Sequence, residues 1–117
     1  MITLLNSSQK AMVCYFSEKL RTRIYSLEYS LAPENKFPKA RDESVLALRW
    51  LIEQGHNPAN ISLCGDSAGA HLAVSLSQHI KNNENIKLHS QCLIYPMCDP
   101  KCDSESHKVF KHGYLLS

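Results

Sequence analysis

The sequence lacks both a long hydrophobic run and an excess of charge of one sign. No apolar stretch approaches the roughly 18 residues that cross a bilayer, so we expect no membrane span. The 13 basic and 11 acidic residues are interspersed and leave a net charge of +2, which gives no reason to expect a nucleic-acid partner. The apolar start, Met1 to Leu5, is short and has no basic flank, so it is not interpreted as a signal peptide. These absences predict a cytoplasmic chain.

An even set of cysteines is also absent, because the count is five. Cys98 and Cys102 are spaced C-x3-C and are followed by His107 and His112, so a zinc site is an alternative. No second cysteine pair accompanies them, and C-x2-C is the commoner ligand spacing. We therefore predict reduced thiols, no metal and no other cofactor.

Helical and strand-like periods alternate along the 117 residues. Helices are expected over residues 7–20 and 39–54, the second ending at Gly55, and a third helix follows residue 67 and closes in the polar run 81–85. Strands are expected over residues 24–29, 61–64 and 88–95. This alternation predicts an α/β fold with three parallel strands and flanking helices, in which ligands bind at the carboxyl ends of the strands.

A G-x-S-x-G pentapeptide follows the second expected strand and precedes the third helix. Its residues are Gly65, Asp66, Ser67, Ala68 and Gly69. The strand, sharp turn and helix form the setting of a nucleophile elbow, in which the small residues let the chain reverse and expose the serine hydroxyl. The N–H groups at the start of the helix point to the place where negative charge develops during acyl transfer. The pattern therefore predicts Ser67 as a nucleophile and Gly65, Asp66 and Gly69 as the elbow around it.

Several further segments stand in a definite order along the chain. They are Glu28-Tyr29-Ser30-Leu31-Ala32-Pro33-Glu34 with Phe37-Pro38, then Trp50, and after the pentapeptide Leu93-Ile94-Tyr95-Pro96 with Asp99. In this order and at about this spacing, they make the chain from Tyr25 to Ser117 resemble the hormone-sensitive-lipase-like branch of the α/β-hydrolases, a group of carboxylesterases. The resemblance implies a partial α/β-hydrolase fold, Ser67 as the catalytic nucleophile, the backbone N–H of Ala68 as an oxyanion-hole donor, and a small acyl ester as the substrate.

The chain departs from the family pattern at four positions. Glu28 and Ser30 stand where the family has aspartate and arginine, so a charge pair implied by the resemblance is missing. Ala70 replaces a glycine, and its methyl group is expected to narrow the site. His71 replaces an asparagine and is expected on the helix flank, partly exposed, rather than as a general base.

The resemblance also implies parts that are not found in this sequence. The family's His-Gly-Gly-Gly loop precedes a helix like residues 7–20, and its catalytic aspartate and histidine follow the segment that ends at Ser117. Residues 1–117 are therefore expected to form a single, incomplete α/β-hydrolase domain. The oxyanion-loop segment is missing upstream and the Asp/His segment downstream. An internal triad of Asp99 with His107 or His112 is the alternative; it has the right order but leaves little room for a strand between them.

Three functional hypotheses follow. The first is a serine carboxylic-ester hydrolase working through an acyl-enzyme, with little activity from this chain alone because a serine without a base is a weak nucleophile. The second is a non-catalytic remnant or one piece of a split hydrolase. That piece would act through self-association or a complementing chain, as exposed sheet edges suggest. The third, a trypsin-like protease, shares Gly-Asp-Ser, but Ala68 and an amphipathic helix follow here instead of Gly-Gly and strands.

Overall fold

The computed structural model describes residues 2–4, 10–30, 38–96 and 105, and its elements confirm the predicted α/β class. In chain order they are β1 (Ile2–Leu4), α1 (Lys10–Leu20), β2 (Tyr25–Ser26), α2 (Lys39–Glu53), the 3-10 turn η2 (Pro58–Asn60), β3 (Ser62–Asp66), α3 (Ala68–Asn83) and β4 (Ser90–Ile94). No helix within the described ranges is long and apolar enough to cross a membrane.

The described sheet has four parallel strands in the order β2-β1-β3-β4, so the expectation of three strands was wrong. The added strand is β1, which pairs with β2 on one side and with β3 on the other. Three residues are too few to show a strand period in the sequence, and β1 becomes a strand through its neighbours. The expected strand 24–29 shrinks to the two residues of β2, because its only partner among the described strands is the three-residue β1.

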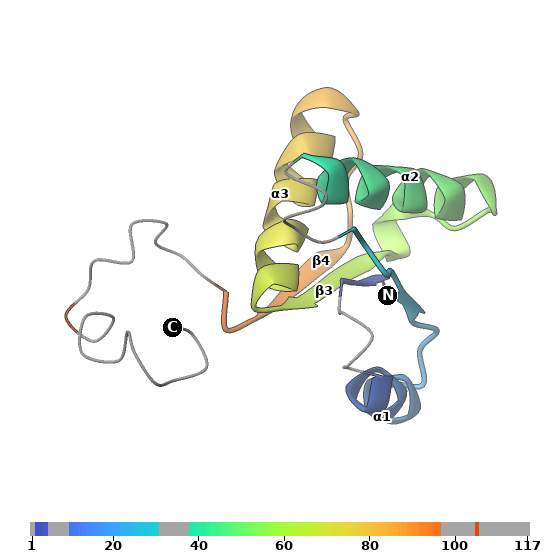
Figure 1. Ribbon diagram of the computed structural model, residues 1–117. Coiled ribbons are helices and arrows are strands. Elements are labelled where there is room, and N and C mark those ends of the chain that lie inside the picture. The colour runs from blue at the N-terminus through green and yellow to red at the C-terminus, as the bar shows by residue number, and fades with distance from the viewer. Residues whose placement is uncertain (1, 5–9, 31–37, 97–104, 106–117) are drawn as a thin grey trace.

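The direction of the crossovers places the helices on both faces of the sheet. The chain moves from β1 to β2 in one direction and then returns across β1 to β3 and on to β4. Right-handed crossovers therefore put α1 on one face and α2 and α3 on the other, as Figure 1 shows. The reversal occurs between β1 and β3, so the topological switch point, where ligands bind in such sheets, lies at the carboxyl end of β3.

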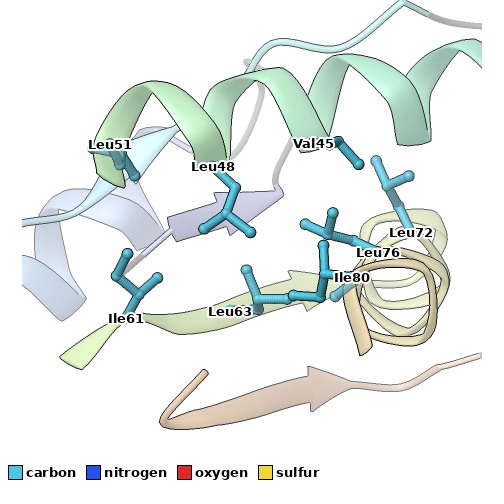
Figure 2. Close-up of a cluster of buried hydrophobic side chains, with 9 residues drawn as sticks. Val45, Leu48, Leu51, Ile61, Leu63, Leu72, Leu76 and Ile80 are labelled. Carbon is cyan, nitrogen blue, oxygen red and sulfur yellow. The ribbon is translucent and has the colours of Figure 1, made fainter. Parts of the chain in front are cut away.

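The apolar core fills the space between the sheet and the face formed by α2 and α3 (Figure 2). Leu48 of α2, Leu63 of β3 and Leu76 of α3 are fully buried and point toward one another. The other members of this cluster are Val45, Leu51, Ile61, Leu72, Ala73 and Ile80. Within the cluster, Val45 and Leu48 of α2 and Leu72, Leu76 and Ile80 of α3 recur at helical spacing, and their packing fixes α3 over β3.

The second helix ends one residue earlier than expected, and Gly55 lies just beyond it as predicted. Gly55 has φ 98°, its N–H donates to the carbonyl of Ile52, and the N–H of His56 donates to that of Leu51. This is the Schellman arrangement, which needs a residue that tolerates the left-handed conformation. The turn directs the chain through η2 into β3.

Candidate active site

Ser67 joins the last residue of β3 to the first residue of α3. It has φ 50° and ψ −115°, a conformation that a residue with a side chain adopts only when its surroundings impose it. Its N–H donates to the carbonyl of Ile94 in β4 at 3.0 Å, and its carbonyl accepts from the N–H of His71 at 3.2 Å. The backbone has the geometry of a nucleophile elbow, whereas the chemical role of Ser67 stays a prediction.

Gly65 is required by the closeness of strand and helix. A Cβ at this position would lie 2.7 Å from the amide nitrogen of Ala70 and still closer to the carbonyl group of Gly69. Real Cβ atoms do not approach backbone atoms so closely, so only glycine lets α3 begin directly above β3. The first glycine of the G-x-S-x-G pattern therefore has a steric cause in this molecule.

Asp66, the last residue of β3, directly precedes Ser67 and bonds to a residue just beyond β4. Its carboxylate is nearly buried, with 8% of the residue exposed, and it accepts a hydrogen bond from the Tyr95 hydroxyl at 3.0 Å. That hydrogen bond and the charge of Asp66 raise the pKa of Tyr95. Burial, and secondarily the same charge, raise the pKa of Tyr29. Both tyrosines therefore remain neutral hydrogen-bond donors beside an anionic carboxylate.

An apolar cavity of about 370 Å³ lies next to Ser67. It is lined by Tyr29, Ala40, Ser67, Ala68, His71, Leu72 and Ser75. From Ser67 to Ser75 it follows α3 for about 12 Å, at the 1.5 Å rise per residue of an α-helix. His71 lies on the exposed helix flank, in agreement with the expectation. Ala70 is fully buried and does not line the cavity, so the expectation that it narrows the site was wrong.

The backbone N–H of Ala68 opens the first turn of α3, where helical N–H groups have no intrahelical acceptor. Within the described ranges no residue accepts a hydrogen bond from it. The positive end of the helix dipole adds to this donor, so an oxyanion forming beside Ser67 would be stabilised.

No histidine side chain among the described residues hydrogen-bonds the Ser67 hydroxyl. His56 pairs with the Tyr25 hydroxyl at 3.1 Å, and His79 and His89 bond to polar neighbours of their own. The alternative triad residues Asp99, His107 and His112 and the zinc alternative with Cys98 and Cys102 lie outside the described residues. Among the residues that are described, no group of three or more histidine, cysteine or carboxylate side chains is placed to hold a metal ion.

Ser30, one of the departures from the family pattern, has a defined partner. Its N–H and its hydroxyl donate to the two carboxylate oxygens of Glu43 in α2, at 2.8 and 2.6 Å. These bonds lower the pKa of Glu43. They tie the segment after β2 to α2 and so replace the charge pair that the resemblance implied.

Sequence reasoning missed two tyrosines at the site. Tyr29 and Tyr95 are part of the segments that carried the family resemblance, but no local pattern assigns them a place beside Asp66 or Ser67. Their positions depend on strand order, which brings the ends of β2 and β4 to either side of β3. Only a fold-level argument could have found them.

Comparisons with known proteins agree with this geometry. The family described as alpha/beta hydrolase fold matches residues 3–117. An acetyl-hydrolase of Streptomyces hygroscopicus is 38% identical over 93 residues, which cover 80% of this chain and 31% of that protein. An esterase of the bacterial hormone-sensitive lipase family superposes with a TM-score of 0.83 at 28% identity, covering 91% of this chain and 38% of the other.

A fungal esterase of Rhizomucor miehei superposes with a TM-score of 0.87 at 26% identity, over 99% of this chain and 40% of the esterase. In each case the chain spans well under half the length of the protein that it matches.

Proposed function

The chain belongs to the α/β-hydrolase family, in its hormone-sensitive-lipase-like esterase branch, and on this premise we propose that it supplies the nucleophile of a serine carboxylic-ester hydrolase. The observation that carries the proposal is the conformation of Ser67 at the β3–α3 junction, next to an apolar cavity. Gly65, Asp66 and Gly69 shape this elbow. The apolar lining favours a small acyl ester over a charged substrate.

The proposed reaction has two steps. The Ser67 oxygen attacks the ester carbonyl, the carbonyl electrons collect on the oxygen next to the Ala68 N–H, and the alcohol leaves with a proton. Water then releases the acid from the acyl-enzyme. The proton of Ser67 needs an acceptor, since a neutral hydroxyl is a poor nucleophile. We propose that this base comes from outside the described residues and that the chain by itself turns over slowly.

A fluorophosphonate probe tests the nucleophile directly, because it needs a single attack and no turnover. We expect covalent labelling of the purified chain at Ser67, located by peptide mass spectrometry, and loss of that label in Ser67→Ala. Equal labelling of the chain and of Ser67→Ala would show that Ser67 is not the nucleophile.

A second candidate function is association, in which the chain is one incomplete domain completed by a second copy or by a complementing chain. Two observations favour it. The outer edge of β4 pairs with no other described strand, and next to it an apolar groove of about 450 Å³ is lined in part by Ile80, Ile86 and Leu88. Unpaired strand edges and apolar grooves invite pairing.

Light scattering of the chain across a range of concentrations tests the association. We expect a dimer or a larger assembly at higher concentration. A monomer with a sharp unfolding transition at every concentration would refute completion by a second copy.

A further inference from the structure

The hydroxyl of Tyr29 has no hydrogen-bond partner among the described residues at the candidate site. Tyr29 is half-buried, packs against the apolar core and lines the cavity that contains Ser67 and Ala68. Buried tyrosine hydroxyls normally find a partner, as that of the half-buried Tyr25 does in His56. Across the described part of the chain, no residue forms a hydrogen bond with the Tyr29 hydroxyl. A polar group left open in an apolar cavity indicates a place for a ligand.

The topology brings Tyr29 to the correct side of the nucleophile. Strand β2 lies on the β1 side of β3, whereas Tyr95 approaches from the β4 side. The Tyr29 side chain therefore reaches the cavity across the switch point between β1 and β3. The neighbouring Ser30 is tied to Glu43 of α2 by two hydrogen bonds, which hold the backbone at Tyr29 in place.

We propose that Tyr29 is a catalytic residue whose hydroxyl donates a hydrogen bond to the carbonyl oxygen of the ester attacked by Ser67. It is the second donor beside the Ala68 N–H, and the assignment rests on the proposed esterase function. When the bond from the Ser67 oxygen to the carbonyl carbon forms, the carbonyl π pair moves onto the oxygen. The serine proton passes to a base, an imidazole or hydroxide. Tyr29 keeps its own proton and stabilises the oxyanion.

The other polar groups of the cavity fit this role less well. Ser75 is eight residues beyond Ser67 on α3, about 12 Å along the helix axis, so it faces the far end of a bound chain. His71 is exposed on the helix flank. Burial and the Asp66 carboxylate raise the pKa of Tyr29, which keeps the phenol protonated at neutral pH.

The first experiment measures the rate at which a fluorophosphonate labels Ser67 in the full chain. Tyr29→Phe should slow labelling by about tenfold to a hundredfold, somewhat below the usual cost of losing one oxyanion donor. The matched control is Tyr15→Phe, which removes the same hydroxyl from an exposed position on α1 and should leave the rate unchanged. The melting temperature of Tyr29→Phe should equal that of the parent, because the hydroxyl has no partner to lose among the described residues. A labelling rate within twofold of the parent would overturn the proposal.

The second experiment needs no nucleophile. In the Ser67→Ala chain, binding of butyranilide, a carbonyl ligand that is not cleaved, is followed by amide chemical shifts in NMR spectra. Adding Tyr29→Phe should weaken binding by about twofold to tenfold, the value of one hydrogen bond. Unchanged binding, or no binding at all, would overturn the role of Tyr29. If Ser67→Ala is labelled as strongly as the parent, the proposed function fails by itself, and this binding test still decides on Tyr29.

Discussion

Replacing Gly65 by alanine tests how the elbow is built. The added Cβ would lie 2.7 Å from the amide nitrogen of Ala70 and closer to Gly69, whereas ordinary van der Waals contact begins at 3.4 Å. The obstructing atoms belong to the helix backbone, so no side-chain rotation relieves the overlap. The start of α3 would have to move away from β3 by at least 0.7 Å, the difference between these two distances.

The loss of unfolding free energy in Gly65→Ala should lie at the upper end of the range for overpacked interiors. Extra methyl groups in a packed interior cost about 1–3 kcal/mol when side chains absorb the strain. Here the helix itself must move, and it carries the fully buried Ala73 and Leu76 of the core. We therefore expect Gly65→Ala to lower the free energy of unfolding by about 3 kcal/mol or more, measured by urea unfolding with circular dichroism.

Gly55→Ala is the matched control for this substitution. Gly55 has φ 98°, and a methyl group on its Cα would meet no described atom within 4 Å, so its cost is backbone strain alone, about 1–2 kcal/mol. Fluorophosphonate labelling of Ser67 should fall at least tenfold in Gly65→Ala and stay at the parent rate in Gly55→Ala. A Gly65→Ala chain with the parent's unfolding free energy and labelling rate would refute the steric argument.

Three further predictions concern the core, the thiols and the anchoring of the segment after β2. Leu48→Ala removes a fully buried side chain and should lower the free energy of unfolding by about 2–5 kcal/mol. Leu46 is 63% exposed, so Leu46→Ala should change that free energy by less than about 0.5 kcal/mol. Urea unfolding measures both variants. Burial, with the neighbouring thiol of Cys92, raises the pKa of Cys64 to about 11. Iodoacetamide at pH 8 should therefore modify the exposed Cys92 and leave Cys64 unmodified until urea is added. Equal alkylation rates of the two thiols in the folded chain would contradict this prediction. Because the folded pKa of Cys64 lies above its ordinary value of 9.0, its contribution to stability is complete below that pH and is lost as the pH rises toward 11. Ser30→Ala removes one of two hydrogen bonds to α2 and should lower the free energy of unfolding by about 1 kcal/mol; a chain as stable as the parent in urea would count against the anchor.

The long elements of the fold are predictable from the sequence because they carry their own signal. The apolar spacing of Val45, Leu48 and Ile52, with Leu51 beside them, predicts a helix that faces a core. The structure buries Val45, Leu48 and Leu51 there and leaves Ile52 partly buried against the same cluster. Gly55 predicts the end of that helix because glycine tolerates the left-handed conformation that follows a helix C-terminus, and it has φ 98° here. In both cases the local pattern and the tertiary contact agree.

The short strands are not predictable in this way because pairing defines them. Ile2–Leu4 has no period of its own and becomes a central strand through hydrogen bonds to residues that lie more than 20 positions away. The strand 61–64 was expected to stop before the elbow, yet β3 continues through Gly65 and Asp66, which pair with Leu93 and Ile94 of β4. The dipeptide Gly-Asp by itself favours a turn, and pairing with the neighbouring strand overrides that preference.

The elbow and the reaction that it would serve depend on different parts of the molecule. Three contacts between described residues shape Ser67: the close approach of α3 at Gly65, the bond from the Ser67 N–H to Ile94, and the carboxylate of Asp66 held by Tyr95. No histidine side chain takes part in these three contacts, and we propose that the base that would activate Ser67 comes from outside the described residues. A single-hit probe therefore tests the geometry of the elbow separately from turnover, which an esterase assay does not. A chain that is labelled at Ser67 but hydrolyses no ester would show that the chain builds the nucleophile without completing the catalytic site.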